Sequence, residues 1–204
     1  MEQITDEQSI GGLNIAILVT DGFEQVELTG PRDALESAGA TTKIVSSRHG
    51  KVQGFNHDSQ ADQFEVALTF EEAACENFDA LLLPGGAFNS EQIRAIPEAQ
   101  QIVQRMHEEG KPIAVICHGA WLLVSAGLVK GKTMTSWPTL QDDIRTAGGI
   151  WVDQEVMVDG NWVSSRTPDD IAAFNQAFIE LLTQRVNASL HGTQDPQASI
   201  GLSG

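Results

Sequence analysis

The sequence predicts an α/β protein in which a doubly wound, mostly parallel sheet carries helices on both faces. Three near-continuous apolar runs predict buried strands, because parallel strands are covered on both sides. The runs are LNIAILVT at 13–20, DALLL at 79–83 and PIAVI at 112–116. Segments with helical patterns lie between the strands, and this alternation favours the same fold class.

The first part of the chain alternates between the two kinds of element. Asp21 and Gly22 end the first strand. In the helix expected next, Pro31 stands early and Gly39 is the stop. Glycine and aspartate then interrupt the pattern, which favours hairpin strands. We expect strands at 13–20 and 41–46, a helix at 27–39, short hairpin strands within 48–69 and a helical turn at 70–74.

The rest of the chain continues this alternation. Asn89 or Ser90 is placed to cap a short helix, and Asp159-Gly160 is a strong hairpin signal. We expect strands at 79–83, 112–116, 133–136, 150–158 and 161–165. We expect a short helix that ends at 94 and further helices at 98–109, 120–128, 139–147 and 167–185.

A single Cys-His pair, Cys117 and His118, stands where the 112–116 strand turns into a helix. Gly119 permits a tight turn, and a nucleophile at such a corner projects out of the packed layers. Its sulfur faces the free N–H groups of the helix, which favours thiolate over thiol. We therefore expect Cys117 to be a nucleophile and His118 its general base and acid. The structural alternatives are a buried, unreactive cysteine and a histidine satisfied by a hydrogen bond.

Glu24 is expected near Cys117, because parallel strands bring their carboxyl ends to one edge of a sheet. Phe23 and Val26 flank it and are expected to desolvate it in part, which raises the pKa of a carboxyl. A protonated Glu24 would donate a hydrogen bond to the thiolate. The alternative is a surface acid, which is the commonest environment for glutamate.

Gly85 and Gly86 close the 79–83 strand and let the backbone approach a ligand. With the N–H of His118 they form a candidate oxyanion hole. Glu91 is a candidate to orient His118 as the third member of a Cys-His-acid set. The alternative for the two glycines is a plain Pro-Gly-Gly turn. The alternative for Glu91 is an exposed acid in the first turn of a helix.

The composition limits the classes of function. The chain has 204 residues, of which 41% are hydrophobic and 20% charged, and this suits one soluble domain. The net charge of -16 argues against nucleic acid or an anionic membrane as a partner, because both require clustered Lys and Arg. No metal or cofactor is expected, because the histidines lack ligand spacing and no phosphate-binding or dinucleotide motif is present.

The two cysteines, Cys75 and Cys117, are too few for a disulfide framework, and Cys75 is expected to pack in the core. The acidic start MEQITDEQSIGG is no secretory signal, and no apolar run reaches membrane-spanning length. A cytoplasmic protein is therefore expected. The expected domains are a flexible arm at 1–12, a single α/β domain at 13–185 and a mobile tail at 186–204.

Four segments together resemble the PfpI family, the intracellular proteases and general stress proteins of the parkinsonism-associated deglycase superfamily. They are FEQVEL, DALLLPGG, GKPIAVICHGAWLL and WVDQEVMVDGNWVSSRTPDD. The likeness runs from about residue 13 to residue 182. It implies a three-layer, flavodoxin-like sandwich that is related to class I glutamine amidotransferases and uses no cofactor.

The resemblance also implies a role for each candidate residue. It places the nucleophile on Cys117, the adjacent histidine on His118, the acid that touches the sulfur on Glu24 and the oxyanion-hole glycine on Gly86. In peptidase-type members a third acid follows that turn and comes from a neighbouring subunit, and here it falls on Glu91. The loop AFNSEQIR that carries Glu91 is longer than the loop in those members.

The activity implied is that of a glyoxalase or deglycase acting in stress, in which a thiolate attacks methylglyoxal or early glycation adducts. One alternative is an intracellular cysteine peptidase, which needs Glu91 and an oligomer. Another is an oxidative-stress sensor or holdase that acts through oxidation of Cys117. The expected partners are small reactive carbonyls, glycated or unfolded protein, and further copies of the chain in a homodimer or larger homo-oligomer.

Overall fold

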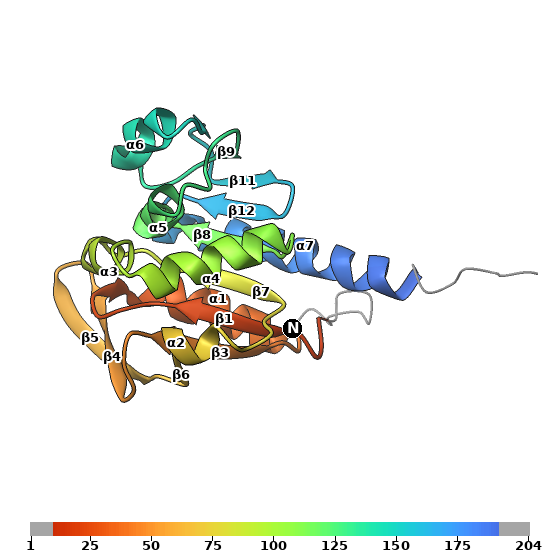
Figure 1. Ribbon diagram of the computed structural model, residues 1–204, viewed down its shortest axis with the longest axis horizontal. Coiled ribbons are helices and arrows are strands. Elements are labelled where there is room, and N and C mark those ends of the chain that lie inside the picture. The colour runs from red at the N-terminus through yellow and green to blue at the C-terminus, as the bar shows by residue number, and fades with distance from the viewer. Residues whose placement is uncertain (1–9, 192–204) are drawn as a thin grey trace, which may run out of the picture.

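The computed structural model describes residues 10–191, which are built around a seven-stranded sheet (Figure 1). Its strands are β1 (Asn14–Leu18), β3 (Thr41–Ser46), β6 (Leu68–Thr69), β7 (Ala80–Leu83), β8 (Ile113–Ile116), β11 (Val156–Asp159) and β12 (Trp162–Ser165). Their order is β11-β12-β8-β7-β1-β3-β6, and every neighbouring pair except β11 and β12 is parallel. This confirms the predicted mostly parallel sheet.

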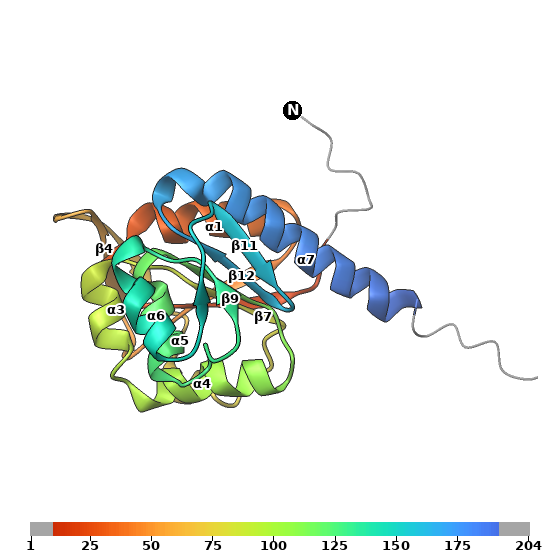
Figure 2. The same cartoon turned by 90° about the horizontal axis from the view of Figure 1, so that it is seen from above.

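Helices cover both faces of the sheet, as Figure 2 shows from above. They are α1 (Gln25–Ser37), α2 (Phe70–Ala73), α3 (Ala87–Ile93), α4 (Pro97–Glu108), α5 (Ala120–Ser125), α6 (Gln141–Thr146) and α7 (Ile171–His191). The helices α1 and α7 lie side by side on one face, and α4 and α5 lie on the other. The result is the predicted three-layer, flavodoxin-like sandwich.

The alternation of side chains along each strand divides the core in two. In β1, Ile15 and Ile17 belong to the cluster that includes apolar residues of α1 and α7, whereas Ala16 and Leu18 belong to the cluster with α2, α4 and α5. All four side chains are buried. Because helices cover both faces, the strand has no polar face, and its sequence is a continuous apolar run.

Two small sheets flank the central one. One consists of β2 (Phe23–Glu24), β4 (Lys51–Asn56) and β5 (Ser59–Glu65), and the other of β9 (Thr133–Met134) and β10 (Ile150–Trp151). The antiparallel β4–β5 pair confirms the hairpin predicted within 48–69. The prediction of a single strand at 150–158 is wrong. It divides into β10, which pairs with β9, and β11, which pairs with β12, because the polar segment 153–155 between them joins neither sheet.

Cys75 does not pack in the core, contrary to the expectation from the sequence. It is a free, exposed cysteine. The helix α2 ends at Ala73 and buries Phe70 and Ala73, which lie three positions apart and therefore share one face. Cys75 follows in the turn after this helix and points away from the same core.

The described part of the chain extends beyond the predicted domain limits of 13 and 185. Ile10 is buried in the core, and α7 continues to His191. The remaining parts of the expected arm and tail, 1–9 and 192–204, lie outside the described residues. Within 10–191, no helix combines the length and the apolar character needed to cross a membrane.

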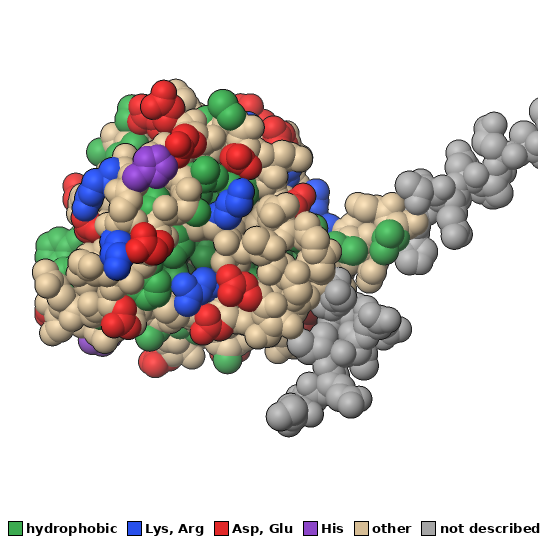
Figure 3. Space-filling view, turned by 90° about the horizontal axis from the view of Figure 1, so that it is seen from below, with side chains coloured by type: hydrophobic (Ala, Val, Ile, Leu, Met, Phe, Trp, Pro, Cys, Tyr) green, Lys and Arg blue, Asp and Glu red, His purple; other side chains and the backbone are tan. Residues whose placement is uncertain are grey.

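Charges of both signs share the surface. On the face shown in Figure 3, the Lys and Arg side chains lie among Asp and Glu side chains and do not gather into a basic patch. Several cations are paired at short range, as in Lys111 with Glu109 at 2.7 Å and Arg48 with Asp21 at 2.7 Å. Such pairing leaves little positive potential for a polyanion to bind.

Candidate active site

A cavity of about 260 Å³ lies at the carboxyl ends of β1, β7 and β8. Its lining residues are Gly22, Glu24, Glu27, His57, Asp58, Gly86, Ala87, Phe88, Cys117, His118, Trp137 and Pro168. The structure thus brings Glu24, Gly86, Cys117 and His118 together, although they come from three distant segments. This edge of the sheet is where ligands bind in open α/β folds.

Cys117 stands at the sharp corner between β8 and α5. The corner is a short 3₁₀ turn, Cys117–Gly119, and Cys117 has a φ of 60°, which is uncommon for any residue other than glycine. Gly119 is required here because a Cβ would lie 2.6 Å from the carbonyl oxygen of Leu83. The backbone strain at Cys117 therefore belongs to a tightly packed turn that presents the sulfur to the cavity.

His118 faces the sulfur although it is the next residue in the chain. Its Nδ1 lies 3.2 Å from Sγ of Cys117, and its ring stacks on Trp137 with the ring centres 5.3 Å apart. Burial lowers the pKa of His118, so the imidazole is neutral near pH 7. A neutral imidazole at this distance is placed to accept the thiol proton.

Glu27, and not Glu24, is the acid that contacts the sulfur. Its side chain is fully buried beside Cys117, and its Oε2 accepts a hydrogen bond from the Gly85 N–H at 2.7 Å. Its other oxygen, Oε1, makes no well-formed hydrogen bond. Burial raises the pKa of Glu27 to about 8, with a smaller contribution from the charge of Glu24, although the bonds to Gly85 and Cys117 oppose this rise. Glu27 is therefore mostly protonated at neutral pH.

The expectation that Glu24 contacts Cys117 is wrong for a geometric reason. Glu24 precedes α1 and pairs with Phe55 in the small sheet, so its carboxyl points to the β4–β5 turn, where Oε2 accepts from the His57 N–H at 3.0 Å. Glu27 lies in the first turn of α1, on the same buried stripe as Pro31. An acid on an otherwise apolar helical stripe is the signal that identifies Glu27 in the sequence.

The pKa of the Cys117 thiol is raised, and not lowered as expected. Burial is the main cause, and the nearby Glu27 carboxylate adds to it. The backbone N–H groups of His118 and Gly86 donate toward the sulfur and oppose the rise. Glu27 and Cys117 therefore titrate as one coupled pair, in which a proton on Glu27 removes the repulsion and permits the thiolate.

The two glycines after β7 have different roles. Gly86 has a φ of 87°, and a Cβ on it would lie 2.5 Å from the Gly22 carbonyl oxygen, so only glycine fits. Its N–H is directed at the sulfur, together with that of His118. The N–H of Gly85 is occupied by Glu27. Gly85 is therefore not available for the candidate oxyanion hole, and the expectation for it is wrong.

Asn89 is a buried residue beside the site, and not the helix cap for which the sequence makes it a candidate. It lies inside α3, is buried, and accepts from the Thr20 N–H at 2.7 Å. Its amide donates to the carbonyl oxygens of Pro84 at 3.2 Å and Gly85 at 3.0 Å. Asn89 thereby joins the end of β1 to the turn that carries Gly86. The helix begins earlier than predicted, at Ala87, because this side chain bonds to the neighbouring turns instead of to the start of its own helix.

Glu91 does not reach the site of its own chain. Its side chain is 70% exposed on α3, and its nearest charged partner is Arg94 at 3.9 Å. It does not line the cavity that contains Cys117 and His118. The expectation that Glu91 orients His118 is therefore not met within one chain.

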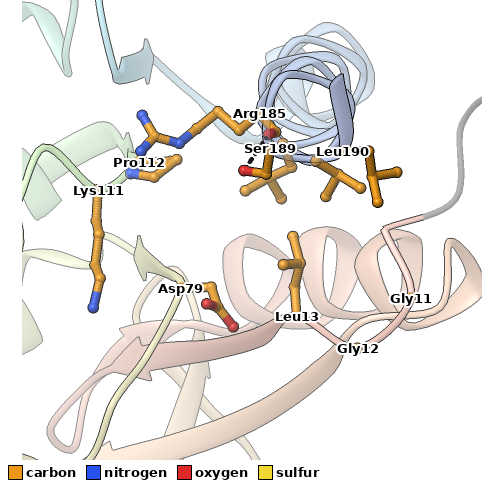
Figure 4. Close-up of a pocket in the computed structure, with 11 residues that line it drawn as sticks. Gly11, Gly12, Leu13, Asp79, Lys111, Pro112, Arg185, Ser189 and Leu190 are labelled. Carbon is orange, nitrogen blue, oxygen red and sulfur yellow. Dashed lines mark hydrogen bonds between the residues drawn. The ribbon is translucent and has the colours of Figure 1, made fainter. Parts of the chain in front are cut away.

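A second cavity, of about 400 Å³, lies at the opposite edge of the sheet, between the amino ends of the strands and α7 (Figure 4). Leu13, Asp79 and Pro112, which directly precede β1, β7 and β8, line it on one side, and Arg185 on α7 lines it on the other. Arg185 is bonded to Asn161, and neither cysteine nor histidine is among the residues that line this cavity. Within residues 10–191, no three His, Cys, Asp or Glu side chains are grouped so that they can hold a metal ion.

Known proteins have sequences similar to this one. The DJ-1/PfpI family profile matches residues 13–181. Deglycase PfpI from Pyrococcus furiosus is 43% identical over 170 residues, which is 83% of this chain and 99% of that protein. The protein named "Putative cysteine protease YraA" from Bacillus subtilis is 37% identical over 168 residues, which is 82% of this chain and 97% of that protein.

A solved structure agrees with these sequence matches. A two-domain protein from Anabaena variabilis, which contains DJ-1/ThiJ/PfpI-like and ferritin-like domains, has a TM-score of 0.75 and 29% sequence identity to this chain. The match covers 91% of this chain and 52% of the other, so this chain spans about half the length of that protein. From the family profile and the identity to its relatives, the chain belongs to the DJ-1/PfpI family.

Proposed function

We propose that this chain is a cofactor-free enzyme in which Cys117 attacks small reactive carbonyls, with methylglyoxal and early glycation adducts as the substrate class. The observation that carries the proposal is the set of groups around one sulfur. His118 Nδ1 lies 3.2 Å away, the N–H groups of Gly86 and His118 are directed at it, and the carboxyl of Glu27 contacts it. The deglycase name of the relative from Pyrococcus furiosus supports the same reaction class.

The protonation states suit addition to a carbonyl. Near pH 7 burial keeps His118 neutral and Glu27 protonated. Neutral His118 accepts the thiol proton, and the thiolate is stabilised by Glu27 and the two backbone N–H groups. The sulfur then bonds to the aldehyde carbon, and the electron pair of the C=O π bond moves to oxygen, beside the N–H groups of Gly86 and His118. The imidazolium returns its proton to this oxygen and gives a hemithioacetal.

Conversion of methylglyoxal to lactate follows from the same groups. Neutral His118 removes the proton from the carbon bonded to sulfur and returns it to the neighbouring carbon. The hydroxyl proton of the hemithioacetal moves to the neighbouring carbonyl oxygen, and the product is a thioester. Water adds to the thioester carbonyl, the C–S bond breaks, and the thiol is regenerated with a proton. The sum is methylglyoxal plus water to lactate and one proton, with no oxidant or reductant. A glycation adduct enters the same sequence once its carbonyl or hemiaminal carbon is exposed to the sulfur.

The test is turnover of methylglyoxal and of a methylglyoxal-modified peptide, with lactate as the measured product. We expect Cys117→Ala to abolish lactate formation and Cys75→Ser, which alters the exposed cysteine, to retain it. Circular dichroism establishes that both variants fold. Full lactate formation by Cys117→Ala would exclude the proposed reaction.

The peptidase alternative receives less support from the geometry. The third acid, Glu91, is exposed and away from the site of its own chain. Because the relative YraA is named a "putative cysteine protease", casein hydrolysis is measured in the same assay. Release of peptides from casein by the wild type, lost in Cys117→Ala, would favour the peptidase.

The sensor or holdase alternative depends on the same sulfur. Glu27, whose carboxyl contacts Cys117, is the acid that would hydrogen-bond to an oxidised Cys117. Mass spectrometry after mild peroxide, run beside the lactate assay, distinguishes the two roles. Sulfinic acid at Cys117 without any turnover would indicate a sensor.

We also propose a reducing cytoplasm as the location and a homodimer as the active form. An exposed free thiol such as Cys75 persists in a reducing compartment. Phe88 is 61% exposed and stands on α3 with Glu91, so a copy packed on α3 would bury an apolar side chain and could receive Glu91 at its site. Light scattering during gel filtration tests the dimer, and a monomer with full turnover would contradict it.

A further inference from the structure

Glu24 is a buried carboxylate of the cavity that the chemistry at the sulfur does not use. Its side chain is 11% exposed and lines the cavity that contains Cys117. Its Oε2 accepts from the His57 N–H at 3.0 Å, and the ring nitrogen Nδ1 of His57 lies 3.5 Å away. Within residues 10–191, no group donates a hydrogen bond to Oε1. One oxygen is therefore held in place, and the other remains for a ligand.

The turn between β4 and β5 fixes this carboxylate at the cavity wall. His57 occupies this turn with a φ of 55°, a conformation that directs its backbone N–H inward while its ring is 85% exposed. Asp58, the next residue, also lines the cavity. The turn thus contributes a second acid to the same wall and holds the first in one orientation.

The charges that line the cavity are of one sign. Glu24 and Asp58 carry these charges, because the third lining acid, Glu27, is mostly protonated at neutral pH, and no lysine or arginine is present there. A partly buried wall of this kind attracts cations and repels anions more strongly than an exposed one, because the local dielectric constant is lower. A compound that approaches Cys117 must pass this wall.

We propose that Glu24 is a specificity-determining residue that selects among electrophiles by charge, favouring cation-bearing compounds and excluding carboxylate-bearing ones. The inference rests on the proposed function for its substrate class, which is then neutral or cationic carbonyl compounds. A carbonyl attached to an ammonium or guanidinium group docks that group on Glu24 while its carbon reaches Cys117. A carbonyl with a carboxylate next to the reactive carbon is repelled.

The test uses thiol reagents whose reaction does not require turnover. Three methanethiosulfonates form a matched set: the cationic trimethylammonioethyl, the anionic sulfonatoethyl and the neutral methyl reagent. In each case the sulfur of Cys117 displaces methanesulfinate and forms a disulfide, and its thiol proton passes to the medium. Rates are measured by mass spectrometry on full-length protein that carries Cys75→Ser, so that Cys117 is the only cysteine.

We expect the cationic reagent to react faster than the anionic one, and Glu24→Gln to reduce this rate ratio by about tenfold. The glutamine retains an oxygen for the His57 N–H, and the neutral reagent reports access to the sulfur in a folded variant. Glu71→Gln is the matched control, because it removes the same charge from an exposed position on α2 and should leave the ratio unchanged.

An equal ratio in the parent protein and in Glu24→Gln would overturn the inference. An equal reduction of the rate ratio in Glu71→Gln would also overturn it, because the effect would then come from the net charge of the protein. Because these outcomes involve no lactate, they are independent of the proposed function. If methylglyoxal were not turned over but the ratio of cationic to anionic reagent rates still depended on Glu24, the proposed reaction would be wrong. The selection by charge at Glu24 would still hold.

Discussion

Glu27 accepts a hydrogen bond from the Gly85 N–H at 2.7 Å and thereby ties the first helix to the turn beside the reactive cysteine. Both partners are fixed before any substrate arrives, because Glu27 is fully buried and a Cβ on Gly85 would lie 2.7 Å from its Oε2. The same carboxyl contacts Cys117. One side chain therefore sets both the position of the turn and the ionisation of the sulfur.

This coupling predicts how the reactivity of Cys117 depends on pH. The first proton that leaves the pair does so near the raised pKa of Glu27, about 8, and above this pH the share of the thiolate form stays constant. We expect the rate of iodoacetamide labelling, in protein with Cys75→Ser, to rise with pH and level off near pH 8. In Glu27→Gln the rate should continue to rise. A plateau at the same pH in both proteins would contradict the coupling.

The same raised pKa predicts a dependence of folding stability on pH. Glu27 binds its proton more tightly in the folded state, with a pKa of about 8, than in the unfolded state, near 4.5. The stabilisation is thus complete below pH 4.5 and is lost as the pH rises to 8, by about 1.4 kcal/mol per unit at most. Urea unfolding at several pH values measures this. We expect the slope to be absent in Glu27→Gln, and equal slopes would contradict the assignment.

Asn89 predicts a loss of both stability and turnover on substitution by leucine. Asn89→Leu leaves the Thr20 N–H and the carbonyl groups of Pro84 and Gly85 without their partner, and such orphaned groups cost about 1–3 kcal/mol each, with partial compensation by relaxation. Urea unfolding and the kcat for methylglyoxal are the measurements. Gln92→Leu, at an exposed position of the same helix, is the control and should change little. Unchanged stability in Asn89→Leu would refute the role as a link.

Gly86→Ala should nearly abolish turnover. The new methyl group would lie 2.5 Å from the Gly22 carbonyl oxygen and 2.6 Å from the Glu24 nitrogen, so the turn must shift and its N–H must leave the sulfur. Loss of an oxyanion donor lowers kcat by about 100-fold or more. Gly50→Ala has the same kind of backbone strain, at a φ of 96°, but nothing within 4 Å of the new methyl group. It should lose about 1–2 kcal/mol of stability and keep its kcat.

The sequence predicts the scaffold of this site well, because each central strand is covered on both faces and so is apolar throughout. The runs at 79–83 and 112–116 correspond to β7 and β8, and the Cys117 corner lies where β8 ends. The strand at 150–158 was predicted wrongly because strand propensity does not reveal which partner each half pairs with. Partner choice depends on distant segments.

The choice between two acids illustrates what sequence patterns leave open. Both Glu24 and Glu27 stand in FEQVEL, and the start of the helix decides which one faces the sulfur. That start depends on the pairing of Glu24 with Phe55 in another sheet, which local patterns do not encode. The predicted direction of the Cys117 pKa is wrong for a related reason, because burial, and after it the charge of Glu27 on α1, opposes the effect of the helix terminus.

The placement of His57 on the β4–β5 hairpin separates recognition from reactivity. This hairpin belongs to a small sheet of its own, whereas Cys117, His118 and Gly86 stand on the ends of the central strands. Changes in the length or charge of the hairpin would alter which molecules enter without moving the reacting atoms. Exchange of this one loop with that of a homologous protein is therefore the change that we expect to alter substrate preference while leaving the reacting groups in place.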